Sequence, residues 1–248
     1  AFAQYAKVSN LVEARDWAMK TFDWLEKTAH DPQHGGYFNR ITRQGESFAN
    51  VSSGNPFGAN STWGSAAWKD QNSSIHILEA LTTLYEINPD SLVRERLEEM
   101  LIVVRDTFVS DQGYLHLYAE ADFTPVVHRD SSREYIMDNL RYDHVSFGHD
   151  IETAFLLLEA SHALGLGEDK KTLAVAKKLV DHTLDTGFDE NYYGLFEGGY
   201  YFDENEPIEI VNNHKTWWAQ IEAMNALLIF SKLYPTERRY EEAFWQMW

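Results

Sequence analysis

Three stretches, "IHILEAL" at 75–81, "GHDIETA" at 148–154 and "WAQIEAM" at 218–224, decide the fold of this chain. Each belongs to an apolar helical pattern, and each carries a glutamate at the same place. A unit of this length holds two helices and a loop, and such units stack to share a core. The sequence therefore predicts a repeat of helical hairpins. The aligned glutamates are Glu79, Glu152 and Glu222, 73 and 70 residues apart (79 to 152, 152 to 222).

The loops between the helices repeat as well. "DPQHGGYF" begins at Asp31, "DQGYLHLY" at Asp111 and "DENYYGLFEGGYYF" at Asp189, with spacings of 80 and 78 residues (31 to 111, 111 to 189). We predict an all-α (α/α)6 toroid that is incomplete in this chain, with an open helical solenoid as the alternative. Residues 1–248 are then one toroid domain that lacks N- and C-terminal helices, and the aromatic stripe of residues 240–248 is expected to remain uncovered.

Apolar periodicity also predicts where the helices lie. Asn10 or Ser9 is expected to cap the first helix, Asp90 to start the third and Gly165 to end the fourth. Strands are expected only in the short Gly/Tyr stretches. The predicted helices are about 9–29, 73–87, 90–109, 148–164, 170–186, 215–233 and 237–248.

Composition excludes several classes of function. The 39 acidic and 21 basic residues give a net charge of −18, which disfavours nucleic acid and anionic lipid as partners. The chain has no cysteine, and no apolar run approaches the roughly 20 residues that span a bilayer. The 8 Trp and 13 Tyr suit the apolar faces of sugar rings. We expect a cytoplasmic protein with a small neutral ligand.

The first candidate site lies in "KDQNSSIHILEALTTLY". His76 and Glu79 are neighbours one helical turn apart, and Asn72 precedes them. Taken alone, this segment favours a structural role, with Asn72 or a serine as the helix cap and a buried His–Glu hydrogen bond.

"GHDIE" repeats the H-x-x-E arrangement in the next unit, with His149 and Glu152. Two such pairs in register are hard to explain as capping. Imidazole titrates near neutral pH, with an unperturbed pKa of about 6.5, so His149 suits acid/base chemistry. Glu152 is placed to fix the tautomer of His149 or to hold a substrate hydroxyl.

The third segment, "HKTWWAQIEA", places Trp217 and Trp218 before Glu222. Adjacent tryptophans usually pack in a core. A tryptophan beside a carboxylate also suits a sugar, because the ring covers C–H faces while the acid binds hydroxyls. A metal site built from His76, His149 and the glutamates is disfavoured, because its ligands would come from separate repeats.

These three segments together resemble the N-acylglucosamine 2-epimerase superfamily, and most of all its cellobiose (mannobiose) 2-epimerase branch. The matching residues are "NSSIHILEALTTLY", "SFGHDIETAFLLLEA" and "KTWWAQIEAMNALL". The resemblance implies an (α/α)6 barrel that interconverts sugars epimeric at C2, without a metal or redox cofactor. It also implies a second catalytic histidine on a later helix, but no histidine follows His214 here. The chain is therefore expected to be an internal fragment.

The resemblance also implies roles for individual residues. His149 corresponds to the general acid/base and Glu152 to a substrate-orienting carboxylate, with His76 as a further catalytic candidate. Phe155 stands where the disaccharide branch often has tryptophan, which leaves the substrate open. The residues that match substrate-binding positions are Asn72, Glu79, Phe155, Trp217, Trp218 and Glu222.

Two other functions are compatible with the same sequence. A glycoside hydrolase or lyase would use Glu152 and a second carboxylate as its acid/base pair. A non-catalytic carbohydrate-binding repeat would need only the pocket. Fold alone does not rank these functions, because toroids host many activities.

Overall fold

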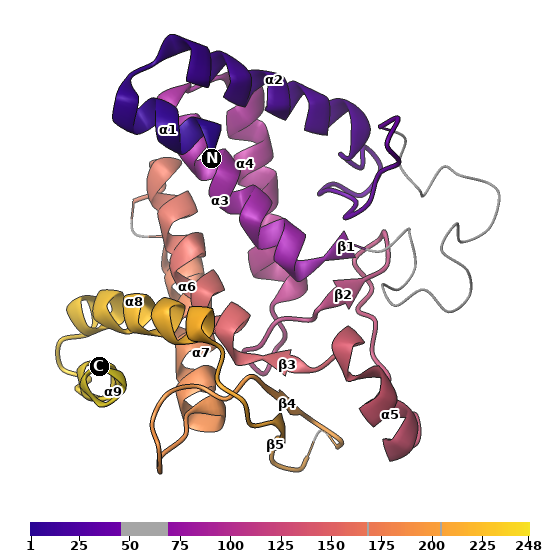
Figure 1. Cartoon of the computed structure of the whole chain (residues 1–248), viewed down its shortest axis with the longest axis vertical. Helices are drawn as coiled ribbons and strands as arrows, with labels where there is room; N and C mark the ends of the chain where they lie inside the picture. The colour runs from indigo at the N-terminus through magenta and orange to yellow at the C-terminus, as the bar shows by residue number, and fades with distance from the viewer. Residues whose placement is uncertain (46–68, 168, 204) are drawn as a thin grey trace. The chain divides into compact units, whose positions relative to one another are not determined.

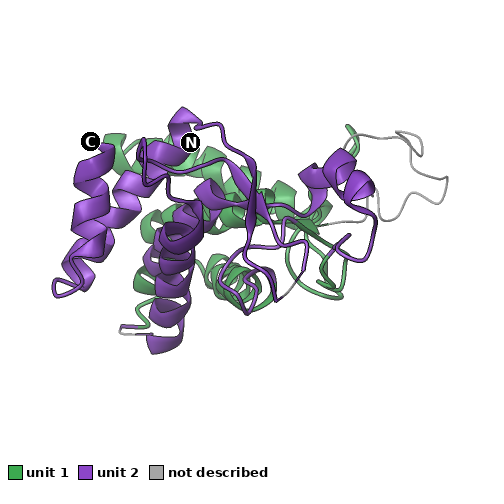
Figure 2. Ribbon diagram, turned by 90° about the horizontal axis from the view of Figure 1, so that it is seen from below, with its two compact units in different colours: residues 1–107, 118–125, 160–166 green, residues 108–117, 126–159, 167–248 purple. Residues whose placement is uncertain are grey.

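The computed structural model describes residues 1–45, 69–167, 169–203 and 205–248. The chain is mostly helical and forms two compact units, coloured separately in Figure 2. Among the described residues, no helix is both long and apolar enough to cross a membrane. Unit 1 comprises residues 1–107, 118–125 and 160–166, and unit 2 comprises residues 108–117, 126–159 and 167–248.

Unit 1 is built on helical packing, with α3 against α4 and α1 against both α2 and α3 (Figure 1). Strands β1 and β2 pair antiparallel, with Lys69 opposite Ala119. The core comes from the apolar stripes of α3 and α4, including the fully buried Ile75, Leu78 and Leu97. The elements are α1 (Phe2–Ser9), α2 (Val12–Thr28), β1 (Lys69–Asp70), α3 (Gln71–Ile87), α4 (Ser91–Val103) and β2 (Tyr118–Ala119).

Unit 2 combines helices with an antiparallel sheet in the order β3-β4-β5. Helix α8 packs against α7 and α9. The elements are α5 (Arg133–Asn139), the 3-10 turn η3 (Leu140–Tyr142), β3 (Val145–Ser146), α6 (Phe147–Ala163), α7 (Lys170–Gly187), β4 (Gly198–Tyr200), β5 (Glu209–Asn212), α8 (Trp217–Leu233) and α9 (Arg239–Met247). The last turn of α6, from residue 160, is counted with unit 1.

The helix predicted over 9–29 is wrong at its start, because the chain forms two helices there. Asn10 does not cap a following helix. It ends α1 in a left-handed conformation, with φ 57°, and donates its N–H to the carbonyl of Ala6. Asparagine tolerates this backbone region better than most residues, which makes it a helix terminator as well as a starter. Ser9 lies inside α1, and α2 begins after Leu11.

Other boundaries agree more closely with the sequence. Asp90 accepts hydrogen bonds from the N–H groups of Leu92 and Val93 and so caps α4. Beyond Val103 the helix widens into a π-helical turn, η2 (Val104–Phe108). Gly165, with φ +70°, follows the end of α6 as predicted.

Two further features were not predicted. The short helix α5 was missed, because its seven residues are too few for a clear period, although Ser132 caps it through the N–H of Tyr135. The aromatic stripe at the C-terminus is partly covered, since Tyr240 and Phe244 are buried and the Tyr240 ring packs on Phe230. Trp245 and Trp248 in the same segment are exposed.

A buried lysine holds the first repeat loop. The ammonium of Lys69 donates to the Oδ2 atom of Asp31 at 2.8 Å, to the carbonyl of Gly35 at 2.6 Å and to that of Ala121 at 2.7 Å. Burial lowers the pKa of Lys69, and its ion pair with Asp31 opposes that shift. Because a buried ammonium needs such partners, Lys69 has a structural role in unit 1.

The third repeat loop is held in the same way within unit 2. The ammonium of Lys215 donates to the Oδ2 atom of Asp189 at 2.7 Å and to the carbonyl of Tyr193. Tyr193 lies four residues after its aspartate, as Gly35 does in the first loop. Lys69 and Lys215 also stand two residues before α3 and α8, respectively. The first and third repeats therefore share individual contacts, in which a lysine binds the loop aspartate and the carbonyl four residues after it.

The second loop corrects the register of this repeat. The N–H of Asp31 donates to Gly36 and that of Asp189 donates to Gly194. In the second loop the equivalent bond runs from Ser110 to the carbonyl of Tyr114. Ser110, rather than Asp111, is thus the counterpart of the two aspartates, and the period is 79 residues in both steps (31 to 110, 110 to 189).

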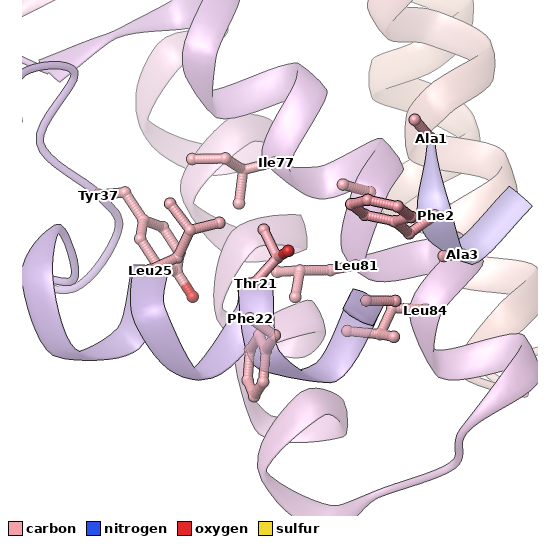
Figure 3. Close-up of a pocket in the computed structure, with 12 residues that line it drawn as sticks. Ala1, Phe2, Ala3, Thr21, Phe22, Leu25, Tyr37, Ile77, Leu81 and Leu84 are labelled. Carbon is pink, nitrogen blue, oxygen red and sulfur yellow. The ribbon is translucent and has the colours of Figure 1, made fainter. Parts of the chain in front are cut away.

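Unit 1 contains an apolar pocket of about 280 Å³ between α1, α2 and α3 (Figure 3). Among the lining side chains, polar atoms occur at the hydroxyls of Thr21 and Tyr37, and the latter donates to Glu26. Ala1 also lines the pocket, but the lining side chains include no carboxylate or imidazole, so the pocket does not suit acid/base chemistry by these groups. Further lining residues are Phe2, Ala18, Phe22, Leu25, Ile77 and Leu81.

Candidate functional site

The candidate site in unit 2 is centred on His149, the third residue of α6. Strand β3 leads directly into this helix, so Ser146 lies three residues before the histidine. The Oγ atom of Ser146 is 2.7 Å from the Nδ1 atom of His149, and Ser146 is only 3% exposed. One ring nitrogen of His149 is therefore hydrogen-bonded to a buried hydroxyl.

Trp218, at the start of α8, packs against the imidazole of His149. The ring centroids are 4.7 Å apart and the planes are inclined by 53°. This contact places the sequence-predicted stacking residue beside the sequence-predicted acid/base. An aromatic ring can stack on a sugar, and a titratable ring nitrogen on the neighbouring helix can transfer a proton to or from it.

Gly148 makes the contact between α6 and α8 possible. A Cβ atom at this position would lie 2.7 Å from both the Cβ of Ala219 and the Cη2 of Trp218. Glycine inside a helix costs about 1 kcal/mol relative to alanine. The close approach of Trp218 explains why a glycine occupies the second position of α6.

Two carboxylates accompany this pair. Glu152 lies one turn after His149 on the same side of α6 and is only 8% exposed. Glu222 lies one turn after Trp218 on α8 and is half-buried. Phe155 is buried on α6, three residues beyond Glu152. In contrast, Trp217 is 76% exposed, so the two adjacent tryptophans have different surroundings.

Sequence reasoning missed Asp150, which follows the histidine. Its side chain is fully buried, and burial raises its pKa well above the ordinary carboxyl value. Its Oδ1 atom accepts the N–H of Leu115 at 2.8 Å, which ties the second repeat loop to α6. On α8, Gln220 does the same for the N–H of Leu195, also at 2.8 Å.

These loop contacts fix the register between the repeats. Asp150 and Gln220 are each two residues before a glutamate, Glu152 and Glu222, and each is the fourth residue of its helix. The sixth residue of α3 is His76, whereas Glu79 is the ninth. Glu79 is therefore one turn further along its helix than the two glutamates with which the sequence aligned it.

The His76–Glu79 pair belongs to unit 1. The Nδ1 atom of His76 is 3.1 Å from the Oε2 atom of Glu79, and their side chains are 45% and 53% exposed. The hydrogen bond with His76 lowers the pKa of Glu79. Asn72 is exposed, and the cap of α3 is Asp70, which accepts the N–H of Ser73. Neither Asn72 nor a serine caps this helix.

The predicted residues thus fall into two sets. His149, Glu152, Trp218 and Glu222 lie on α6 and α8 of unit 2, whereas the other set, on α3, is in unit 1. A single cavity lined by both sets remains a prediction, because they belong to different units. In the parts of the chain that the structure describes, no cluster of three or more His, Asp or Glu residues is arranged to hold a metal ion.

Unit 2 contains a small polar pocket, lined by residues that include His116, Arg129, Asp143 and Tyr200. Asp143 accepts the hydroxyl of Tyr200 at 2.9 Å, and burial lowers the pKa of His116. The free volume is about 10 Å³, which suits a single water molecule. A sugar ring does not fit this volume, so the pocket is not the candidate substrate site.

Comparison with known proteins finds similar sequences over most of the chain. Two cellobiose 2-epimerases, from Dictyoglomus turgidum and Ruminococcus albus, are 22% and 28% identical over 99% and 90% of this chain. The chain spans about half the length of these curated relatives, 55% and 50% respectively.

Solved structures give the same result for the fold. A cellobiose 2-epimerase from Bacillus thermoamylovorans B4167 superposes with a TM-score of 0.78 at 20% identity, covering 100% of this chain and 56% of that one. The enzyme from Spirochaeta thermophila DSM 6192 gives a TM-score of 0.75 at 27% identity, covering 100% and 55%. The predicted all-α class of (α/α) barrels is confirmed.

The match to the family extends over residues 1–248, all of the sequence. It includes both the described helices and the loops that repeat between them. The chain belongs to the N-acylglucosamine 2-epimerase (GlcNAc 2-epimerase) family.

Proposed function

We propose that the protein containing this chain is a carbohydrate isomerase that epimerises aldoses at C2, acting on the reducing end of a mono- or disaccharide. The observation that carries the proposal is the contact between His149 and Trp218, in a chain that matches the epimerase family throughout. The names of its relatives, cellobiose 2-epimerases, favour a disaccharide such as cellobiose as the first substrate to test.

The reaction proceeds by proton transfer at C2 of the open-chain aldose. His149 removes the C2 proton, and the electron pair of the C–H bond becomes the C1–C2 double bond of an enediolate. Its negative charge rests on the C1 oxygen and requires hydrogen-bond donors. A second acid then returns a proton to the opposite face of C2, which inverts that centre. For this second acid, His76 is the candidate within this sequence.

The remaining side chains bind the sugar. Trp218 covers a C–H face of the sugar in its ring or open-chain form. Glu152 and Glu222 accept hydrogen bonds from the hydroxyl groups of the sugar. Glu152 is buried beside the helix start, so it holds a substrate hydroxyl with little competition from water. The chemistry assigned to these residues needs no metal or redox cofactor.

The test is to incubate the full-length protein with cellobiose, mannose and N-acetylglucosamine in D₂O and to follow the products by NMR. The proposal predicts a C2 epimer that carries deuterium at C2. Cleavage of cellobiose into two monosaccharides would instead establish a glycoside hydrolase, and binding without conversion would establish a carbohydrate-binding repeat. A ketose as the sole product would mean that the enediolate is protonated at C1 instead.

A further inference from the structure

We propose that Ser146 is a positioning residue that holds the imidazole of His149 in both of its protonation states. The inference rests on the proposed function, because it assigns a partner to the acid/base of that reaction. It starts from one contact, the 2.7 Å separation between the Oγ atom of Ser146 and the Nδ1 atom of His149. At 3% exposure, Ser146 is largely shielded from competing water.

The backbone fixes this hydroxyl. Ser146 belongs to β3 and pairs with Gly198 of β4 in an antiparallel register. A Cβ atom on Gly198 would lie 2.8 Å from the ring of His144 and 3.1 Å from the carbonyl of Val145, so only glycine lets the two strands approach this closely. Since α6 begins at the next residue, only two residues lie between the serine and the histidine.

Trp218 restricts the imidazole from another direction. Its ring packs at 4.7 Å from the imidazole centroid, on a helix that Gly148 allows to come close. The hydrogen bond of Ser146 to Nδ1 then selects one of the two flipped orientations of the ring about the Cβ–Cγ bond. The two contacts together define which edge of His149 carries the reactive nitrogen, namely Nε2.

A hydroxyl is suited to a histidine that must work in both directions. When Nε2 is unprotonated and acts as a base, the N–H at Nδ1 donates to the Oγ atom of Ser146. When Nε2 has taken up the C2 proton, the ring is imidazolium, and the N–H at Nδ1 still donates to the same oxygen. A hydroxyl therefore holds the ring in both protonation states, and it does so without the negative charge of a carboxylate, which would favour the imidazolium. Epimerisation is reversible, so a partner that serves both protonation states serves both directions.

The default role of a serine before a helix is capping, which contributes to stability but not to proton transfer. The contrast with α3 argues for more than capping. There the residue before the helix, Asp70, caps through the N–H of Ser73, and the Nδ1 atom of His76 faces the carboxylate of Glu79. In α6 the corresponding side chain contacts the histidine ring itself.

The experiment compares Ser146→Ala, Ser146→Thr and Ser161→Ala in the full-length protein. Ser161 is a buried serine near the other end of α6 and serves as the matched control. Loss of one hydrogen bond predicts a fall in kcat of about 5- to 10-fold for Ser146→Ala. We expect Ser146→Thr, which keeps the hydroxyl, to recover part of that loss, and Ser161→Ala to retain wild-type kcat.

A second readout separates positioning from folding. ¹⁵N NMR of labelled histidine reports the tautomer of His149, and we expect the balance between its Nδ1–H and Nε2–H forms to shift in Ser146→Ala but not in Ser161→Ala. An unchanged tautomer balance, or a kcat loss that merely parallels the fall in Tm of both alanine variants, would overturn the inference. A wild-type protein that epimerises no sugar would overturn the proposed function, whereas the NMR comparison would still decide whether Ser146 holds the ring.

Discussion

The H-x-x-E sequence occurs in both α3 and α6, one turn later in α3, and the two pairs have different surroundings. In α3, His76 and Glu79 bind each other and both are about half exposed. In α6, His149 is held by a buried serine hydroxyl and a tryptophan ring, and Glu152 is buried. An identical spacing along the sequence thus produces a solvated pair in one helix and a restrained acid/base candidate in the other.

The difference originates in what precedes and faces each helix. The chain before α3 supplies Asp70, a capping carboxylate, whereas β3 before α6 supplies Ser146. Gly148 allows α8 to approach α6, and the equivalent second position of α3 is Asn72. Preorganisation at α6 therefore depends on strand pairing and on a helix contact, neither of which is encoded in the motif itself.

The largest expected effect is on catalysis. In the full-length protein, His149→Asn should lower kcat by about 10²- to 10⁴-fold, because the variant removes a general acid/base. His76→Asn should lower it by less than about tenfold, since its partner is a half-exposed carboxylate. Steady-state kinetics of C2 epimerisation measure both. Equal losses of kcat in the two variants would contradict the distinction between the α3 and α6 pairs and would identify His76 as the second acid/base.

Gly148→Ala should have the next largest effect. The added methyl group would overlap Trp218 and Ala219, at a cost of about 1–3 kcal/mol in the free energy of unfolding and with a lower kcat. Gly165→Ala, at the other end of α6, is the control. Its Cβ meets nothing within 4 Å, and its φ of +70° costs about 1–2 kcal/mol. We expect kcat to fall only for Gly148→Ala in parallel urea and kinetic measurements.

Asp150→Asn tests the buried carboxyl beside His149. Burial raises the folded-state pKa of Asp150, so the folded protein binds this proton more tightly than the unfolded chain does. Its contribution to stability is complete below the unfolded pKa and is lost as pH rises towards the folded one, by up to about 1.4 kcal/mol per pH unit. Asparagine keeps an acceptor for Leu115 and does not ionise.

The measurement is the free energy of unfolding of wild type and Asp150→Asn in urea between pH 4 and pH 8. We expect the variant to lose less stability than wild type as pH rises through this window. Identical pH profiles would mean that Asp150 does not retain its proton in the folded state.

The smallest effect is expected for Glu79→Gln. Its hydrogen bond with His76 lowers the pKa of Glu79, so the pair stabilises the fold above the ordinary carboxyl pKa and loses this effect as pH falls. Because both side chains are about half exposed, solvent screening limits the gain to below about 0.5 kcal/mol. Urea unfolding at pH 7 and pH 3 measures it. A loss above 1 kcal/mol at pH 7 would show that this pair is not simply solvated.

Sequence alone predicted the long helices and the existence of the repeat, but not the short helix α5 or the register of the repeat. The apolar period of α3, α6 and α8 is long and regular, and the Asp90 cap and Gly165 stop act locally, so they can be read from neighbouring residues. The break at Asn10 was misassigned because the same residue type starts and ends helices. The one-turn offset of Glu79 could not be predicted from the sequence. The motif around Glu79 aligns with those around Glu152 and Glu222, but α3 begins one turn earlier relative to its motif than α6 and α8 do.

The site was predictable only in part, for a related reason. His149 and Trp218 carry recognisable chemistry, and the structure brings them into contact. Ser146, Gly148 and Asp150 act through contacts with the ring of His149, with α8 and with a loop some 35 residues away, respectively. Such roles depend on tertiary packing, and a single sequence contains no local pattern that distinguishes them.

The most direct test of the central claim is exchange of the C2 proton. The full-length wild type, His149→Asn and His76→Asn are incubated with cellobiose in D₂O, and deuterium at C2 of both substrate and epimer is followed by NMR. The account predicts that deuterium enters with wild type, enters more slowly with His76→Asn, and does not enter above background with His149→Asn. Deuterium entering at the wild-type rate with His149→Asn would contradict the assignment of proton abstraction to α6.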